Sequence, residues 1–126
     1  MTHRSEILIS WCAVFVYAAF IFYLSSLSHP PVPYLRALEK YNFDKVLHGV
    51  EYGVLGILLS RALSLTWELS GAWLFFAAFI LGSLYGASDE WHQSFVPLRE
   101  CNIYDWTADS AGTALGIWIY GRNKKF

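Results

Sequence analysis

The chain has little charge and little cysteine. Charged residues make up 15% of its 126 residues, against about a quarter in ordinary soluble domains. The net charge is -1, which gives no electrostatic reason to expect a nucleic-acid partner. Two cysteines do not make a disulfide framework. The sequence also lacks an H-E-x-x-H metal-binding motif and any known nucleophile motif, so no familiar type of catalytic centre is indicated.

Long apolar runs take the place of charge. Residues 7–24 carry no charge, and a helix of about 18 residues spans roughly 27 Å, close to the hydrocarbon core of a bilayer. A cleaved signal peptide would have a shorter apolar part followed by a small-residue cleavage site, and this run is longer and has no such site after it. A soluble bundle would need polar helix faces, which the first and third apolar runs lack.

The pattern predicts an all-α, polytopic membrane protein. We expect a single domain over residues 1–126, built as a bundle of four transmembrane helices with the polar residues gathered at one end. A short interfacial helix is predicted at Tyr34–Glu39, where apolar and charged residues could separate at the membrane surface. The expected transmembrane helices cover about 7–24, 44–65, 72–93 and 106–120.

Small residues recur at helical spacing in two of these helices. Ala108, Gly112 and Gly116 lie four residues apart, so they share one helix face. Small residues on one face favour close packing of helices in a membrane. Glycines in the 44–65 helix permit the same contact: Gly49, Gly53 and Gly56.

Polar chemistry gathers at one end of the expected bundle. Because helices joined by short loops alternate in direction, the first and third end where the second and fourth begin. Ionisable groups near membrane depth are costly and usually face a partner or a site, so we expect a shared pocket. Eight of the ten acidic residues belong to this end: Glu39, Asp44, Glu51, Asp89, Glu90, Glu100, Asp105 and Asp109.

Helical spacing directs these side chains toward one volume. One face of the second helix carries Asp44 and His48, followed by Glu51 or Tyr52, at positions i, i+4 and i+7 or i+8. The same spacing recurs at the end of the third helix in Tyr85, Asp89 and Gln93. In the fourth helix it relates Asp105 to Asp109 and continues into the small-residue face.

Orientation is predicted from the basic residues. Lys and Arg number five at the end with the termini and four at the polar end. Cytoplasmic loops are richer in these residues, and the basic tail adds to that excess. We therefore expect a multi-pass protein of the cell membrane with both termini in the cytoplasm and the polar residues facing outward.

Several residues have two interpretations. Lys45 and Arg99 could hold a phosphate or simply pair with carboxylates and stabilise the bundle. His48 is equally a structural hydrogen-bonding group or a proton-transfer or ligand residue. Solvated surface positions are favoured for Glu90, Glu100, His29 and His92.

Three linked segments resemble the VanZ-like membrane proteins. The family patterns D-K-x-x-H-x-x-x-Y, D-E-x-x-Q-x-F-x-P-x-R and D-x-x-x-[ND]-x-x-G-x-x-x-G occur in order within residues 44–116. This chain has Asp109 where many members have Asn, which adds an acid. The matching residues are Asp44, Lys45, His48 and Tyr52, then Asp89, Glu90, Gln93, Phe95, Pro97 and Arg99, then Asp105, Asp109, Gly112 and Gly116.

The resemblance implies a small polytopic membrane protein of the bacterial envelope. The family is named for a member associated with resistance to teicoplanin. We therefore expect a bilayer-embedded protein that binds a lipid or cell-wall component and influences glycopeptide susceptibility. Its oligomeric state is left open.

Two alternatives come from other functional classes. A membrane enzyme could act on a lipid or polyprenyl-linked phosphate headgroup, with acids and histidine supplying proton transfer or ligands for a divalent metal. A proton-coupled transporter would need acids at the bilayer midplane, whereas here they gather at one end. The candidate catalytic residues are Asp44, His48, Asp89, Glu90, Asp105 and Asp109, and the candidate substrate-binding residues are Lys45, Tyr52, Gln93 and Arg99.

Overall fold

A computed structural model describes residues 1–27, 43–97, 99 and 101–123, apart from the side chains of residues 43 and 44. The described residues form helices and no strands, so the prediction of an all-helical fold is confirmed. The interfacial helix expected at Tyr34–Glu39 lies outside the described residues. The helices are α1 (His3–Ser26), α3 (Phe43–Trp67), α4 (Gly71–Gln93) and α5 (Ile103–Arg122).

Two helices begin earlier than the sequence predicts, because each has a capping side chain. Thr2 accepts a hydrogen bond from the Ser5 backbone N–H at 3.2 Å, so α1 includes most of the polar start. Asn102 accepts one from the Tyr104 backbone N–H at 2.9 Å, so α5 begins before residue 106. Such caps satisfy backbone donors that the first turn of a helix leaves without partners.

Three of the described helices are long and apolar enough to cross a membrane: α1, residues 45–67 of α3, and α4. The sequence predicted four, but α5 falls outside this group. Its sequence includes Asp105, Asp109 and Arg122, which lower its hydropathy. Asp105, Asp109 and Thr113 are nonetheless buried, so α5 presents polar side chains to the interior of the bundle.

The closest approach between helices joins α3 to α5. A Cβ atom added at Gly112 would lie 2.7 Å from Gly49 Cα, and one added at Gly116 would lie 2.8 Å from the Gly53 carbonyl carbon. A Cβ at Gly56 would similarly meet the Thr113 backbone. The two predicted sets of small residues therefore face each other, and their backbones are in contact.

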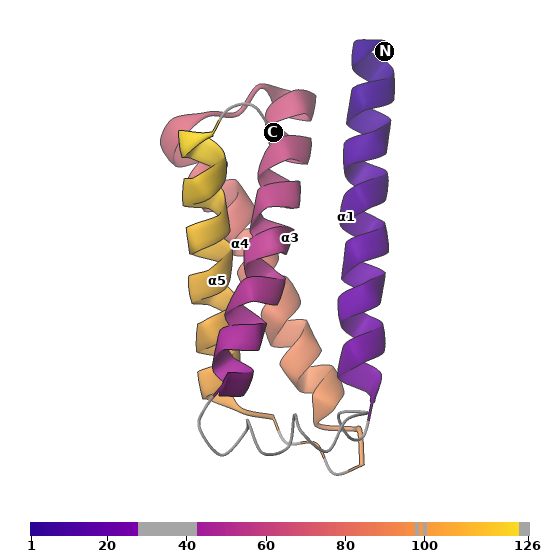
Figure 1. The fold of residues 1–126 in the computed structure, drawn as a ribbon, viewed down its shortest axis with the longest axis vertical. Coiled ribbons are helices and arrows are strands. Elements are labelled where there is room, and N and C mark those ends of the chain that lie inside the picture. The colour runs from indigo at the N-terminus through magenta and orange to yellow at the C-terminus, as the bar shows by residue number, and fades with distance from the viewer. Residues whose placement is uncertain (28–42, 98, 100, 124–126) are drawn as a thin grey trace.

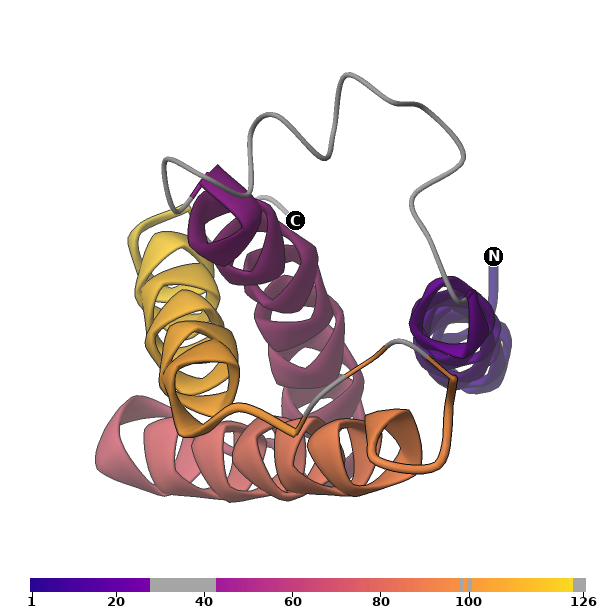
Figure 2. The same ribbon diagram turned by 90° about the horizontal axis from the view of Figure 1, so that it is seen from below.

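The helices are arranged as an antiparallel bundle with α1 at its side (Figures 1 and 2). α4 runs obliquely across α3 and α5, and α1 packs on α3 and α4. The apolar core centres on α3, with Tyr52, Leu55 and Leu63 buried. We call the end where α1 and α4 finish and α3 and α5 start the polar end; the start of α1 and the end of α5 lie at the opposite end.

Candidate functional site

Five buried or half-buried side chains from three helices meet at the polar end. We call them the polar cluster: His48 and Tyr52 from α3, Asp89 and Glu90 from α4, and Asp109 from α5. Tyr52 and Asp109 are fully buried, and the exposed fractions of Glu90 and Asp89 are 3% and 6%. The helical spacing predicted this convergence for four of them.

Hydrogen bonds connect the cluster across the helices. His48 Nδ1 lies 2.7 Å from Asp109 Oδ1, which joins α3 to α5. The Tyr52 hydroxyl donates to Asp89 Oδ2 at 3.2 Å, joining α3 to α4. The Asn102 backbone N–H, just before α5, donates to Glu90 Oε2 at 3.1 Å. Each carboxylate therefore has one oxygen held in place.

The second oxygen of each carboxylate is not held by a hydrogen bond from the described residues. Asp89 Oδ1, Glu90 Oε1 and Asp109 Oδ2 are buried and have no hydrogen-bond partner among the described residues. A buried polar atom without a partner costs about 1–3 kcal/mol, and more when it is charged. The bundle therefore holds acceptor groups that its own described side chains do not satisfy.

Glycine makes room for this arrangement on α4. A Cβ atom added at Gly86 would lie 3.2 Å from Asp109 Cβ and 3.3 Å from Asp109 Oδ2. That contact is tighter than a normal van der Waals distance, so a larger residue would displace the carboxylate. Gly86 thus allows α4 and α5 to approach each other with Asp109 between them.

Beside the cluster, Lys45 forms an ion pair with Asp105. Lys45 Nζ lies 2.5 Å from Asp105 Oδ1, and their side chains are 26% and 13% exposed. This pair joins the first turns of α3 and α5. The interpretation of Lys45 as a partner for a carboxylate is confirmed, and its partly exposed side chain also places a positive charge at the edge of the site.

Arg99 makes hydrogen bonds to the end of α1. Its Nε donates to the Leu27 carbonyl at 2.8 Å, and Nη2 donates to the Leu24 carbonyl at 3.4 Å. The side chain therefore satisfies carbonyls at the end of α1, and no ion pair joins it to a carboxylate of the described residues. Gln93 is buried at the end of α4, whereas the side chain of Asp44 lies outside the described residues.

Two expectations of surface positions are corrected. Glu90 is buried rather than solvated, because it follows Gly82 and Gly86 at intervals of four on the α4 face that packs against α5. His92 stacks on Phe22 with ring centroids 4.3 Å apart, and its Nδ1 lies 3.2 Å from Ser25 Oγ. It therefore helps to attach α1. His29 and Glu100 lie outside the described residues.

Sequence reasoning did not find Asn102, which has two roles at the site. Its side chain caps α5, and its backbone N–H fixes one oxygen of Glu90. An N-cap signal was present, because Asn directly precedes the helix. The contact with Glu90 depends on how the loop returns from α4, which the sequence pattern alone does not determine.

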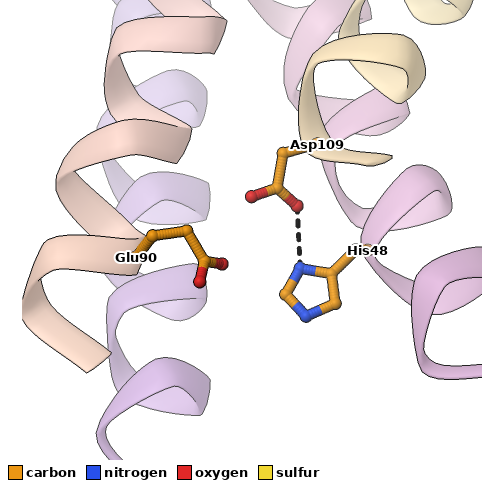
Figure 3. Close-up of side chains that lie close together, drawn as sticks. All are labelled: His48, Glu90 and Asp109. Carbon is orange, nitrogen blue, oxygen red and sulfur yellow. Dashed lines mark hydrogen bonds and ion pairs between the residues drawn. The ribbon is translucent and has the colours of Figure 1, made fainter. Parts of the chain in front are cut away.

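The cluster combines an imidazole with buried carboxylates. Such groups can bind a cation, accept hydrogen bonds from hydroxyl or ammonium groups, or transfer a proton. The His48–Asp109 contact also fixes the orientation of the imidazole ring. In Figure 3, the Glu90 and Asp109 carboxylates and the His48 ring converge on one small volume.

An all-helical bundle with membrane-length helices and a buried polar site at one end defines a class of small membrane proteins. Within that class, this chain belongs to the VanZ family, because the family model described as VanZ/LLP1 matches residues 4–122. The family predicted from the three linked segments is therefore confirmed. No curated protein and no solved structure matches the chain.

Proposed function

We propose that this VanZ-family protein is a multi-pass protein of the bacterial envelope that binds a lipid or lipid-linked cell-wall component at its polar end. By doing so it influences susceptibility to glycopeptides such as teicoplanin. The observation that carries the proposal is the set of buried carboxylate oxygens without partners among the described residues. Ionisable groups buried in a membrane bundle are costly and usually mark a functional site.

An apolar groove favours a lipid over a soluble ligand. The groove lies between α3 and α5, has a volume of about 630 Å³, and is lined by residues such as Val50, Val54, Ala111 and Leu115. Lys45 is the charged residue of its lining. A hydrocarbon chain in this groove would bring an anionic headgroup beside the positive charge of Lys45.

The proposed topology includes α5 as a fourth crossing. Its acids face α3 and α4 instead of lipid, so its low hydropathy does not prevent it from crossing inside the bundle. Four crossings place both termini on one side, which we propose is the cytoplasm. The polar end then faces outward.

The two native cysteines test this orientation. Cys101 is exposed near the polar end, and Cys12 is exposed within α1. A membrane-impermeant maleimide added to intact cells should label the Cys12→Ser variant through Cys101 and leave the Cys101→Ser variant unlabelled. If Cys101 is labelled only after lysis, the polar end faces the cytoplasm and the proposed orientation is wrong.

Lipid binding can be measured by native mass spectrometry of the protein in mild detergent. Wild type should retain an anionic lipid from a mixture of phosphatidylglycerol, cardiolipin and undecaprenyl phosphate. Asp89→Asn tests the cluster, and Ala111→Trp should fill the groove. Ala87→Trp, at an exposed position on α4, is the matched control and should retain the lipid. Equal retention by all four proteins would contradict a specific site.

The effect on cells is tested separately. Deletion of the gene should change the concentration of teicoplanin that inhibits growth, and wild-type protein should restore the original value. The Asp89→Asn variant should not restore it at equal expression. An unchanged response to teicoplanin in the deletion strain would remove the glycopeptide role while leaving lipid binding to be judged by mass spectrometry.

An enzyme acting on a lipid-linked phosphate headgroup is the second candidate. The favouring observation is the His48–Asp109 contact of 2.7 Å, because a carboxylate that orients an imidazole is a recurrent arrangement for proton transfer. This candidate is tested by incubating undecaprenyl phosphate or undecaprenyl pyrophosphate with wild type and, separately, with Asp109→Asn, and measuring the product formed. Turnover by wild type alone would establish it, and no turnover by either would reject it for these substrates.

A further inference from the structure

Three side chains of the polar cluster form a compact group of mixed donors. His48, Glu90 and Asp109 come from three different helices, and each offers one nitrogen or oxygen atom within 4.8 Å of the other two. Figure 3 shows the two carboxylates and the imidazole turned toward one another. Their position depends on the packing of α3, α4 and α5, so it is as well defined as the bundle itself.

Hydrogen bonds within the protein leave this group incomplete. Glu90 and Asp109 are more than nine-tenths buried, yet Glu90 Oε1 and Asp109 Oδ2 have no hydrogen-bond partner among the described residues. His48 can neutralise one carboxylate at most. A buried group of one imidazole and two carboxylates therefore keeps an excess of negative charge unless it is protonated or binds a cation.

We propose that His48, Glu90 and Asp109 bind a divalent transition-metal cation, with Zn²⁺ the best match. Imidazole nitrogen and carboxylate oxygen are common zinc ligands, whereas Mg²⁺ and Ca²⁺ prefer oxygen ligands alone. The three ligand atoms lie within 4.8 Å of one another. Tetrahedral zinc with bonds of about 2.0–2.2 Å places its ligand atoms about 3.4 Å apart, so binding of the ion draws the three side chains closer together. Three protein ligands leave a coordination position for another group.

Neighbouring groups support the ligands. The Asn102 backbone N–H holds Glu90 through Oε2 and leaves Oε1 buried without a hydrogen-bond partner among the described residues. Gly86 provides the space for the Asp109 carboxylate. Partners of this kind fix the orientation of metal ligands.

A cation also resolves an electrostatic conflict in the site. Buried carboxylates alone repel the phosphate of an anionic headgroup, whereas a bound divalent cation attracts it. This inference rests on the proposed function for the identity of the headgroup, but binding of the metal needs no lipid. Failure of one can therefore be distinguished from failure of the other.

The test is titration of chelator-treated, purified protein in detergent with Zn²⁺, Mn²⁺ or Mg²⁺, followed by calorimetry and native mass spectrometry. Wild type should bind one Zn²⁺ more tightly than Mg²⁺. His48→Gln, Glu90→Gln and Asp109→Asn should each lose more than about tenfold in affinity, since even residues that only support a ligand contribute roughly 10–100-fold. Glu6→Gln, at the opposite end of the bundle, should bind as wild type does.

Thermal unfolding without metal separates loss of the site from loss of the fold. Metal-free Glu90→Gln should unfold at or above the wild-type temperature, because one of two neighbouring buried carboxylates is removed. Added Zn²⁺ should then raise the unfolding temperature of wild type and not of this variant. Absence of Zn²⁺ binding by wild type, or unchanged affinity in all three ligand variants, would overturn the proposal. If wild type retains lipid but binds no Zn²⁺, the metal site is overturned and the proposed function still stands.

Discussion

The helices α1 and α5 are held in the bundle in opposite ways. α1 contains the longest charge-free run, but its buried residues are confined to one narrow stripe: Ser10, Val14, Ile21 and Ser25. α5 is shorter and less apolar, yet it buries Asp105, Asp109, Gly112, Thr113, Gly116 and Ile117. Hydrophobicity therefore does not indicate how closely a helix is packed in this protein.

The contacts of the two helices explain this difference. α5 meets α3 through glycines, so the backbones themselves are in contact. α1 is attached mainly by long side chains: Trp11 donates to Thr66, Tyr17 to the Glu51 carbonyl, and Tyr85 to the Ala18 carbonyl. In lipid, apolar surface needs no protein partner, and close packing of small residues supplies the association. The site lies where packing is closest.

Enlarging a glycine between α3 and α5 should have the largest effect. Gly112→Leu would force side-chain atoms into the Gly49 backbone. Overpacking commonly costs about 1–3 kcal/mol and occasionally more, and backbone cannot move aside as a side chain can. We expect the variant to fail to assemble or to unfold far below wild type in detergent.

Gly121→Leu is the matched control for that substitution. A Cβ at Gly121 would meet no atom within 4 Å among the described residues, so the same change should leave the unfolding temperature within a few degrees of wild type. Equal stability of the two variants would show that the glycine contact does not hold α5.

Much of this packing was predictable from the sequence. The packed face of α5 was indicated by Ala108, Gly112 and Gly116. Small residues recur there about once per helical turn, so they share one face, and small residues on one face favour close helix packing. The position of Asp109 followed from the same face, one turn from Asp105. Local spacing was sufficient here because both features repeat along a single helix.

Other features depended on relations between helices. Glu90 was expected on the surface, although Gly82 and Gly86 extend a small-residue stripe to it and could have indicated burial. Arg99 was expected to hold a phosphate or to pair with a carboxylate, and the contact of its Nε with the Leu27 carbonyl at the end of α1 was not foreseen. Whether a charge at a helix end faces inward depends on loop geometry and on the crossing angle of α4, and neither is encoded by periodicity.

Removing the Arg99 contact should have an intermediate effect that is local to α1. Arg99→Met removes two charge-assisted hydrogen bonds to Leu27 and Leu24 carbonyls, and hydrogen bonds to charged groups are worth about 1.5–3 kcal/mol. Amide hydrogen exchange should become faster in the last turns of α1 while protection in α3 is retained.

Arg61→Met provides the control, because Arg61 is exposed on α3. Its exchange pattern should match wild type throughout α1. Uniform loss of protection across all helices in Arg99→Met would mean that α1 and the rest of the bundle unfold as one unit, and the contrast between α1 and α5 would then be wrong.

The smallest effect is expected at the other end of α1. Trp11→Phe removes the 2.8 Å hydrogen bond to Thr66 but keeps an aromatic ring near Trp67. Hydrogen bonds between membrane helices average about 0.6 kcal/mol, with a maximum near 1.7 kcal/mol, so a decrease of one or two degrees in unfolding temperature is expected. Trp73→Phe is the control, since Trp73 is 78% exposed. Trp11→Phe could instead lower the unfolding temperature as much as Gly112→Leu does. Single polar contacts would then hold α1 as firmly as backbone packing holds α5, and the distinction between the two helices would be wrong.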